Sequence, residues 1–231
     1  MKKFGFTLAE VLITLGIIGV VAAMTIPSLS QNITKKKFSS LLKQDYAILS
    51  QVVLQVTDAG GLASMTKNND MNEMKNAFNT FFLPYLKTIS VCYDEAGCWS
   101  DTITIYLNGS NVKYFRNGRP GEKVVCFTLS NGTFVCLDDY PDRELWSEFG
   151  IKDTTPFELV VFLDLNGKSK PNVMGRDVFT FIMLSDGTLI PAGHDRSEAE
   201  QAKDCSKGGR GLWCPSYLKS KNWDFNAIKY Y

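Results

Sequence analysis

Histidine is almost absent from this sequence: His194 is the single one in 231 residues. One histidine excludes multi-histidine metal sites and argues against a histidine-based hydrolase. Asp186 and Asp195 lie near it, but no nucleophile motif such as GxSxG accompanies them. We interpret His194 as a surface loop residue and predict no enzyme activity, no cofactor and no metal site.

The sequence also has no large excess of positive or negative charge and no closely paired cysteines. Lys and Arg number 25 against 24 Asp and Glu, so no overall basic field points to nucleic acid. The six cysteines form no CxxC motif, which removes support for zinc ribbons and thioredoxin-type chemistry. With 45% hydrophobic residues the chain is globular, of one domain plus an extension, and an even cysteine count suits disulfides in an oxidising compartment.

The N-terminus carries the one long apolar run. Residues Phe6 to Ile26 contain a single charge, Glu10, and follow a short basic leader, Met1-Lys2-Lys3-Phe4-Gly5. At ~1.5 Å per residue such a helix spans about 32 Å, enough for a bilayer core of ~30 Å. The run therefore predicts a single-pass membrane helix.

A signal peptide and a signal anchor are two simple interpretations of this apolar run, and neither explains Glu10. A secretory signal peptide has an apolar region of about 7–15 residues and no acid within it. A plain signal anchor fits the length but leaves Glu10 unexplained, although a carboxylate inside a spanning helix costs roughly 2.5–3.5 kcal/mol on insertion scales.

A third interpretation accounts for the glycine, the acid and the leader together. Gly5, then Phe6-Thr7-Leu8-Ala9-Glu10 at the head of an apolar helix, resembles the type IV prepilin cleavage and methylation motif over about 30 residues. The resemblance implies that a prepilin peptidase cuts after Gly5 and methylates Phe6. It further implies that subunits polymerise through the helix with Glu10 required for assembly, and that Pro27 kinks the helix.

The resemblance also implies an α+β fold, in which a long N-terminal membrane-spanning helix packs on an antiparallel β-sheet head. Lys2 and Lys3 favour a cytoplasmic N-terminus, while Lys35-Lys36-Lys37 nearly balance that count beyond the helix. The leader is too short to hold a domain and sets the orientation, with the head outside the inner or cytoplasmic membrane. The expected parts are leader 1–5, membrane and assembly helix 6–27, amphipathic continuation 28–60 and head 61–231.

Residue patterns beyond the membrane run predict the elements of the head. Apolar residues from Leu29 to Val56 recur in steps of three and four, so the helix should continue from Ser28 until Gly60-Gly61 stops it. Pro27 should bend or locally melt it. Asp70 and Glu73 resemble a capping box for a second helix over 71–83, ending near Pro84.

After Trp99 the pattern changes to strands joined by tight turns. Asn108-Gly109, Asn131-Gly132 and Asp186-Gly187 are expected hairpin turns. The expected strands are Thr102–Leu107, Val112–Phe115, Val124–Leu129, Thr133–Leu137, Phe157–Leu163, Val178–Leu184 and Thr188–Ile190. The tail from Ser197 shows little periodicity, and we expect its cysteines to hold it in place.

Three local disulfides are predicted: Cys92–Cys98, Cys126–Cys136 and Cys205–Cys214. If residues 130–132 form a three-residue loop with Gly132 left-handed, Cys126 faces Cys136 directly. A two-residue Asn-Gly loop would instead place Cys126 opposite Leu137 and strain or prevent the bridge.

Two further segments resemble binding sites. Asp164, Asn166 and Asp177 around Gly167 superficially resemble a calcium loop, but Lys168 and Lys170 lie inside it and no acid stands at the twelfth position. A tight Asx-type turn is favoured. The segment Val112–Lys123 mixes basic and aromatic residues, as single-stranded DNA grooves do, but a solvated hairpin face is favoured and no firm nucleic-acid partner is predicted.

These patterns predict a structural role. The expected function is a subunit of a type IV pilus or type II secretion pseudopilus, with prepilin peptidase, other pilin subunits and the membrane as partners. The alternative is a minor tip pilin that binds DNA, a secreted substrate or a surface.

Overall fold

The computed structural model describes residues 5, 7–65, 70–113, 115–116, 119–121, 123–138, 147–152 and 157–230. Within it the chain forms two compact units, residues 1–37 and residues 38–231. The described residues of the N-terminal unit are helical from Leu8 onward, and the second unit, which comprises the end of this helix and the head, holds the strands of the described residues.

Helix α1 runs from Leu8 to Asp58 and contributes to both units. Its head portion buries a stripe at helical spacing, which includes Phe38, Leu42 and Leu49 and ends at Val56. Leu29 and Ile33, which begin the apolar stripe in the sequence, are 60% and 59% exposed, so burial of the stripe begins at Phe38. Helix α2, Gly61–Met65, follows the turn at Gly60.

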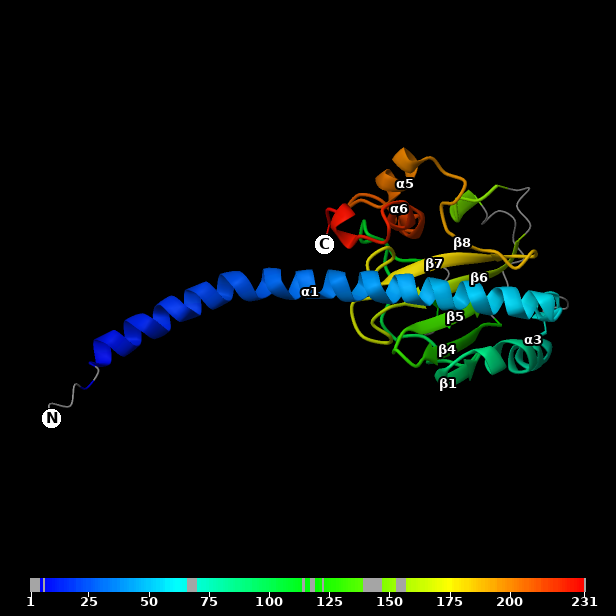
Figure 1. The fold of residues 1–231 in the computed structure, drawn as a ribbon, viewed down its shortest axis with the longest axis horizontal. Helices are drawn as coiled ribbons and strands as arrows, with labels where there is room; N and C mark the ends of the chain where they lie inside the picture. Colours follow the sequence, from blue (N-terminus) through cyan, green and yellow to red (C-terminus); the bar gives the residue numbers. More distant parts are fainter. Residues whose placement is uncertain are drawn as a thin grey trace. The chain divides into compact units, whose positions relative to one another are not determined.

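The head contains a six-stranded antiparallel sheet, which confirms the predicted α+β class. Its strands are β1 Thr88–Tyr93, β4 Val125–Leu129, β5 Phe134–Asp138, β6 Phe157–Asp164, β7 Val178–Leu184 and β8 Leu189–Pro191, in the order β1-β4-β5-β6-β7-β8. From β4 onward each strand pairs with the next along the chain, as a meander (Figure 1). A separate small hairpin pairs β2 Phe115–Arg116 with β3 Arg119–Pro120.

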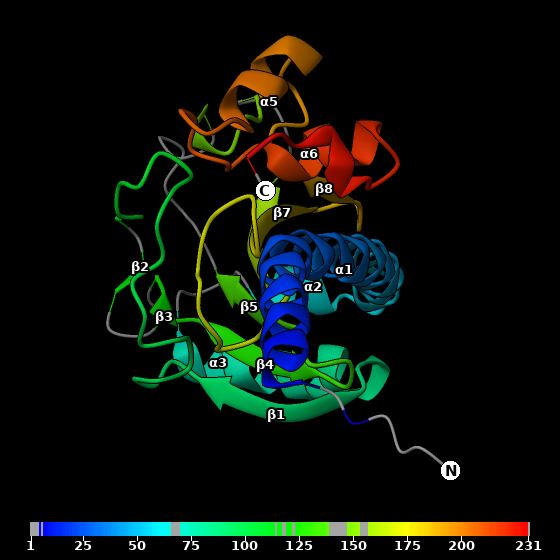
Figure 2. The same ribbon diagram turned by 90° about the vertical axis from the view of Figure 1, so that its left-hand side faces the viewer.

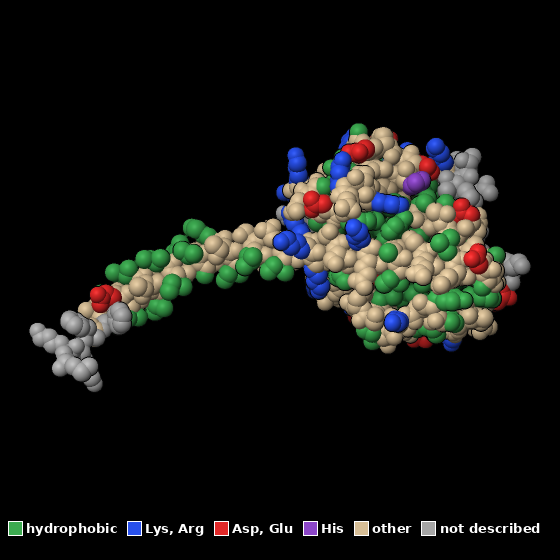
Figure 3. Space-filling model, in the orientation of Figure 1, with side chains coloured by type: hydrophobic (Ala, Val, Ile, Leu, Met, Phe, Trp, Pro, Cys, Tyr) green, Lys and Arg blue, Asp and Glu red, His purple; other side chains and the backbone are tan. Residues whose placement is uncertain are grey.

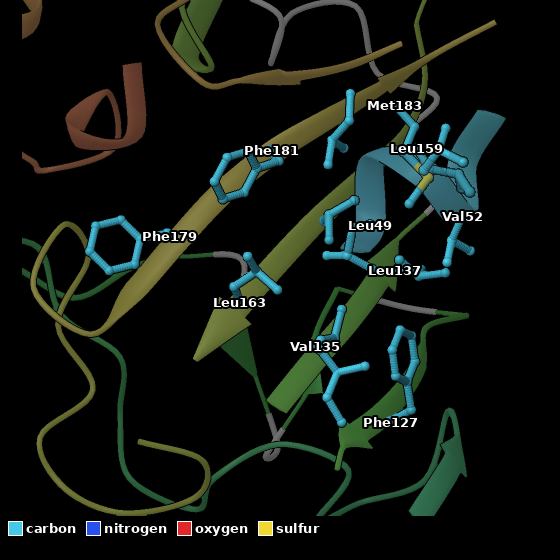
Figure 4. Packing of buried hydrophobic residues seen from close by; sticks show 14 of the residues in the cluster. Leu49, Val52, Phe127, Val135, Leu137, Leu159, Leu163, Phe179, Phe181 and Met183 are labelled. Atoms are coloured by element: carbon cyan, nitrogen blue, oxygen red, sulfur yellow. The ribbon is translucent and has the colours of Figure 1, made fainter. Parts of the chain in front are cut away.

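The head portion of α1 lies along one face of this sheet (Figures 1 and 2). Figure 4 shows Leu49 and Val52 of the helix facing strand side chains such as Phe127, Leu137 and Leu159. At about 25 cal/mol per Å² of apolar surface, this contact is the main favourable term that holds the helix on the sheet. The same cluster continues to the C-terminal segment through Phe225, whose ring lies 6.3 Å from that of Phe38.

The opposite face of the sheet is buried as well. Alternate residues of the same strands, among them Cys136, Phe162 and Ile182, form a second cluster covered by loop residues such as Trp99 and Phe149. Because both faces are buried, the central strands are mostly apolar at successive positions rather than alternating.

The three expected Asx-Gly turns form with one shared geometry. The side chains of Asn108, Asn131 and Asp186 each accept a hydrogen bond from the backbone N–H two residues ahead, at 3.0, 3.0 and 2.9 Å. The glycine after each has a positive φ of 85°, 91° and 85°. A glycine tolerates this left-handed conformation because it lacks a Cβ, so the turns form where the sequence predicts them.

Two expected strands are wrong in extent. Residues 102–107 make only isolated bridges, in which Ile105 pairs with Asn111 and Val173. Strand β2 begins at Phe115 instead of Val112. This segment lies over the second core cluster, where Trp99, Tyr106 and Val112 are buried, so its apolar residues serve as a cover rather than as a sheet strand.

The helices were also incompletely predicted. Helix α3, Met71–Ala77, is capped by Asp70 as expected, but the chain continues as a π-helical turn over Phe78–Phe82 and a 3-10 turn over Leu83–Tyr85. The tail contains α5 Glu198–Asp204, α6 Cys214–Ser220 and a 3-10 turn Phe225–Ala227. Both tail helices have seven residues, which is too short for a clear amphipathic period.

Candidate functional site

The N-terminal segment holds the expected processing residues. Gly5 is exposed, and a Cβ built on it would meet nothing within 4 Å. Any requirement for glycine at this position is therefore not imposed by packing within the chain. Phe6, the other expected processing residue, lies outside the described residues.

Helix α1 begins with a reciprocal cap that the sequence analysis missed. The Glu10 carboxylate accepts hydrogen bonds from the Thr7 backbone N–H and from the Thr7 hydroxyl, both at 2.8 Å. The Thr7 hydroxyl in turn accepts from the Glu10 N–H at 3.3 Å. The signal was present in the sequence, since Thr7-Leu8-Ala9-Glu10 has the spacing of a capping box.

The helix that follows exposes its apolar residues on all sides. Leu12, Ile13, Leu15, Ile17 and Ile18 are between 60% and 63% exposed. Hydrophobic side chains cover this segment in Figure 3. By length and composition α1 can cross a membrane. None of the residues in its apolar stretch is buried within the chain. An apolar surface of this extent requires a lipid environment or contact with other proteins.

The helix does not melt at Pro27. Residues on both sides remain helical, although proline supplies no N–H for the carbonyl of Ala23. Two hydroxyls nearby donate to other carbonyls of the helix, Thr25 to Val21 at 2.9 Å and Ser28 to Thr25 at 3.0 Å. The kink at Pro27 stays a prediction.

Three disulfides occur in the head, between Cys92 and Cys98, Cys126 and Cys136, and Cys205 and Cys214. These are the neighbour pairs expected from the sequence. Leu129 N–H donates to Thr133 across a loop of three residues, and Cys126 lies directly opposite Cys136 in the β4–β5 register. The two-residue alternative is therefore not adopted.

The Asp164 loop forms the expected Asx turn, because the Asn166 N–H donates to the Asp164 carboxylate at 3.2 Å. Burial raises the pKa of Asp164 to about 9, with a further contribution from the nearby Asp177 carboxylate. Burial also raises the pKa of Asp177, to about 8, against the opposing effect of the Val173 N–H. The Lys168 ammonium donates a hydrogen bond to the Gly97 carbonyl at 2.5 Å.

The described residues of the head give no further support to a metal site or to a nucleic-acid site. In the described parts of the chain, no three His, Cys, Asp or Glu residues gather where they could hold a metal ion. The basic hairpin forms as β2 and β3, but Tyr114, Glu122 and the connecting residues 117–118 lie outside the described residues. His194 is exposed, while Asp195 accepts from the Lys152 N–H and Asp186 belongs to a turn.

A buried acid joins α1 to the sheet. Asp45 is fully buried and accepts hydrogen bonds from the Asn131 amide at 2.6 Å and the Thr133 hydroxyl at 2.7 Å. Burial raises the pKa of Asp45, and these two hydrogen bonds oppose the shift. The contact fixes α1 to the β4–β5 turn, and sequence reasoning missed it because the partners lie almost ninety residues away along the chain, at separations of 86 and 88.

Comparison with known proteins assigns the N-terminal segment. Residues 1–26 match the prokaryotic N-terminal methylation motif, which is the prepilin motif of type IV pilins and pseudopilins. The match confirms the resemblance inferred from the sequence. No curated protein and no solved structure matches the chain.

Proposed function

We propose that this protein is a structural subunit of a type IV pilus or of a type II secretion pseudopilus. The observation that carries the proposal is the methylation motif at residues 1–26, placed at the start of a helix whose apolar surface is exposed on all sides. A subunit anchored in a membrane and later packed against its copies has this surface, because lipid or neighbouring helices cover it in either state.

The proposed maturation begins with prepilin peptidase, which cuts between Gly5 and Phe6 and methylates the new amine. The leader is 1–5, the membrane and assembly helix is 6–27, its continuation is 28–60 and the head is 61–231. The head lies outside the inner or cytoplasmic membrane, and the assembled form is an extracellular filament or a periplasmic pseudopilus.

Glu10 is proposed to set the axial register between subunits. The rest of the spanning helix is apolar, so contacts between two such helices hardly depend on how far one slides along the other. The amine of Phe6 on an incoming subunit can pair with Glu10 of its neighbour, and in a low dielectric that pair is strong at one register alone. Kinking at Pro27 would let the helix adjust within the filament.

Intact mass spectrometry of membrane-extracted protein tests the processing step. In cells with prepilin peptidase, the mature mass should lack Met1–Gly5 and carry one additional methyl group. Gly5→Val should accumulate the uncut form, because a Cβ obstructs close approach of the protease to the backbone. A wild-type mass that retains the leader refutes the proposal.

The alternative is a minor tip pilin that binds DNA, a secreted substrate or a surface. Such a subunit is expected in fewer copies than a major filament subunit. In a sheared filament preparation a major subunit dominates, whereas a tip subunit is present in few copies. Quantitative mass spectrometry of that preparation separates the two.

A further inference from the structure

The part of α1 just beyond the apolar run carries a cluster of lysines. Between Glu10 and Asp45 the sequence contains four lysines, Lys35, Lys36, Lys37 and Lys43, and no Asp or Glu. Lys36 and Lys37 are exposed. No acidic residue lies within four positions of either, so the helix provides no ion pair at the i±3 or i±4 spacing.

Three lysines nearer the sheet, in contrast, have partners within the chain. Lys43 donates to Asn222 at 3.4 Å, Lys219 donates to Tyr46 at 2.6 Å, and Lys221 pairs with Glu198 at 2.5 Å. Lys36 and Lys37 are thus two adjacent exposed positive charges with no acid at helical spacing from them.

The helix places this triplet close to the membrane surface. Lys35 stands nine residues beyond Ile26, an axial rise of about 14 Å. The headgroup layer extends about 5–7 Å beyond the hydrocarbon core, and the Debye length at physiological salt is about 8 Å. Side chains on a helix lean toward its N-terminus, which here is the membrane side, and lysine stems extend further in the same direction.

We propose that Lys35, Lys36 and Lys37 form a docking site for anionic phospholipid headgroups on the side of the membrane where the head lies. The site holds the subunit at a set depth in the membrane. The inference rests on the proposed function in one respect, that α1 crosses a membrane. Lys36 and Lys37 carry it, and Lys35 adds its charge.

Amine labelling of the full chain in vesicles tests the site. The protein is reconstituted in phosphatidylcholine alone or in an equal mixture with phosphatidylglycerol, and a membrane-impermeant acetylating reagent is applied. Mass spectrometry then gives the reactivity of Lys36 and Lys37 relative to Lys87 and Lys207, which are exposed on the head. This ratio is independent of the fraction of molecules that face outward.

The ratio should fall several-fold in the anionic vesicles and recover in about 1 M NaCl, where the Debye length is about 3 Å. An equal ratio in both lipids overturns the proposal. Protection that appears in both lipids and grows with protein density also overturns it, because the lysines would then contact a second copy of the chain.

A pair of variants provides the matched control. Lys36→Gln/Lys37→Gln should retain several-fold less phosphatidylglycerol per molecule than wild type after mild detergent extraction, whereas Lys203→Gln/Lys207→Gln, on exposed head positions, should retain the wild-type amount. Equal retention by all three proteins refutes the site. Failure of leader cleavage in cells would refute the proposed function and leave this lipid result unaffected, so the two failures are distinguishable.

Discussion

The carboxylate of Glu10 accepts hydrogen bonds from both the backbone N–H and the hydroxyl of Thr7, each at 2.8 Å. Glu10 therefore has a partner within its own helix before any second subunit is present. Two roles have to be separated, capping of α1 and pairing with the amine of another subunit. An N-cap interaction contributes about 0.5–2 kcal/mol to a helix, so loss of capping alone is a modest change.

Comparison of Glu10→Gln with Glu10→Val separates these roles. The Gln side chain retains an acceptor for the Thr7 donors but has no charge, whereas Val has neither. If the charge sets the register, both variants should be inserted and cleaved normally yet fail to enter filaments as the only copy. Blots of sheared filament and membrane fractions measure this.

Normal incorporation of Glu10→Gln together with loss of Glu10→Val would instead assign Glu10 to capping. Normal incorporation of both variants would remove Glu10 from the assembly mechanism.

Removal of the buried acid between α1 and the sheet should weaken the head. Asp45→Ala leaves the Asn131 amide and the Thr133 hydroxyl without their acceptor, and a buried unsatisfied donor costs about 1–3 kcal/mol. Release of the desolvated carboxylate offsets part of this cost. We expect the free energy of unfolding to fall by about 1–3 kcal/mol, measured by denaturation of the full chain in detergent.

The control for Asp45 is Gln51→Ala, an exposed position on the same helix, which should change the free energy of unfolding by less than about 0.5 kcal/mol. Equal effects of the two variants would contradict a specific contact at Asp45.

The buried pair Asp164 and Asp177 predicts a pH dependence of stability. Their folded pKa values, about 9 and about 8, lie above the ordinary value of 3.8, so the folded state holds protons that the unfolded state releases. Stability should therefore decrease as the pH rises from about 4 and level off above about 9. Asp164→Asn, which resembles the protonated acid, should raise the free energy of unfolding at pH 8 by more than about 1.4 kcal/mol, the equivalent of one pKa unit.

At pH 4 the same variant should differ little from wild type. Asp101→Asn changes an exposed acid and serves as the control. Thermal melts at both pH values test the prediction, and a wild-type stability that rises between pH 5 and pH 8 while that of Asp164→Asn stays flat would refute it.

The disulfide assignment is testable because Cys126 has two cysteines opposite it. In the sheet register Cys92 on β1 and Cys136 on β5 both face Cys126 on β4. Non-reducing peptide mapping should show Cys126 joined to Cys136 and Cys92 joined to Cys98. Replacing Cys126 and Cys136 with Ser should lower the free energy of unfolding by about 2–3 kcal/mol, by chain-entropy estimates for a short loop.

A peptide that links Cys92 to Cys126 would show that the bridge forms between strands that are distant in the sequence. Free thiols in all the cysteine peptides would indicate a reducing compartment.

Local chemistry accounts for the parts of the fold that were predictable. The turn at Asn131-Gly132 needs only an acceptor side chain followed by a residue tolerant of positive φ, and both are adjacent in the sequence. Asp70 caps α3 for a similar reason. The strand Thr88–Tyr93 was missed although its composition favours a strand, and residues 102–107 were expected to be a strand although they make isolated bridges. Apolar residues that cover a sheet and apolar residues that belong to it give similar patterns.

By itself the sequence determined that the N-terminus carries a prepilin-type motif on an apolar helix, and it determined where most helices, turns and strands occur. Each of these features depends on residues a few positions apart. Tertiary structure alone decided which acids are buried. Asp45 meets Thr133 across 88 residues, and Asp164 approaches Asp177 because β6 and β7 pair in one register. The pKa of a carboxylate depends on its desolvation and on the charges around it. Those quantities exist only after the sheet has formed and α1 has packed against it.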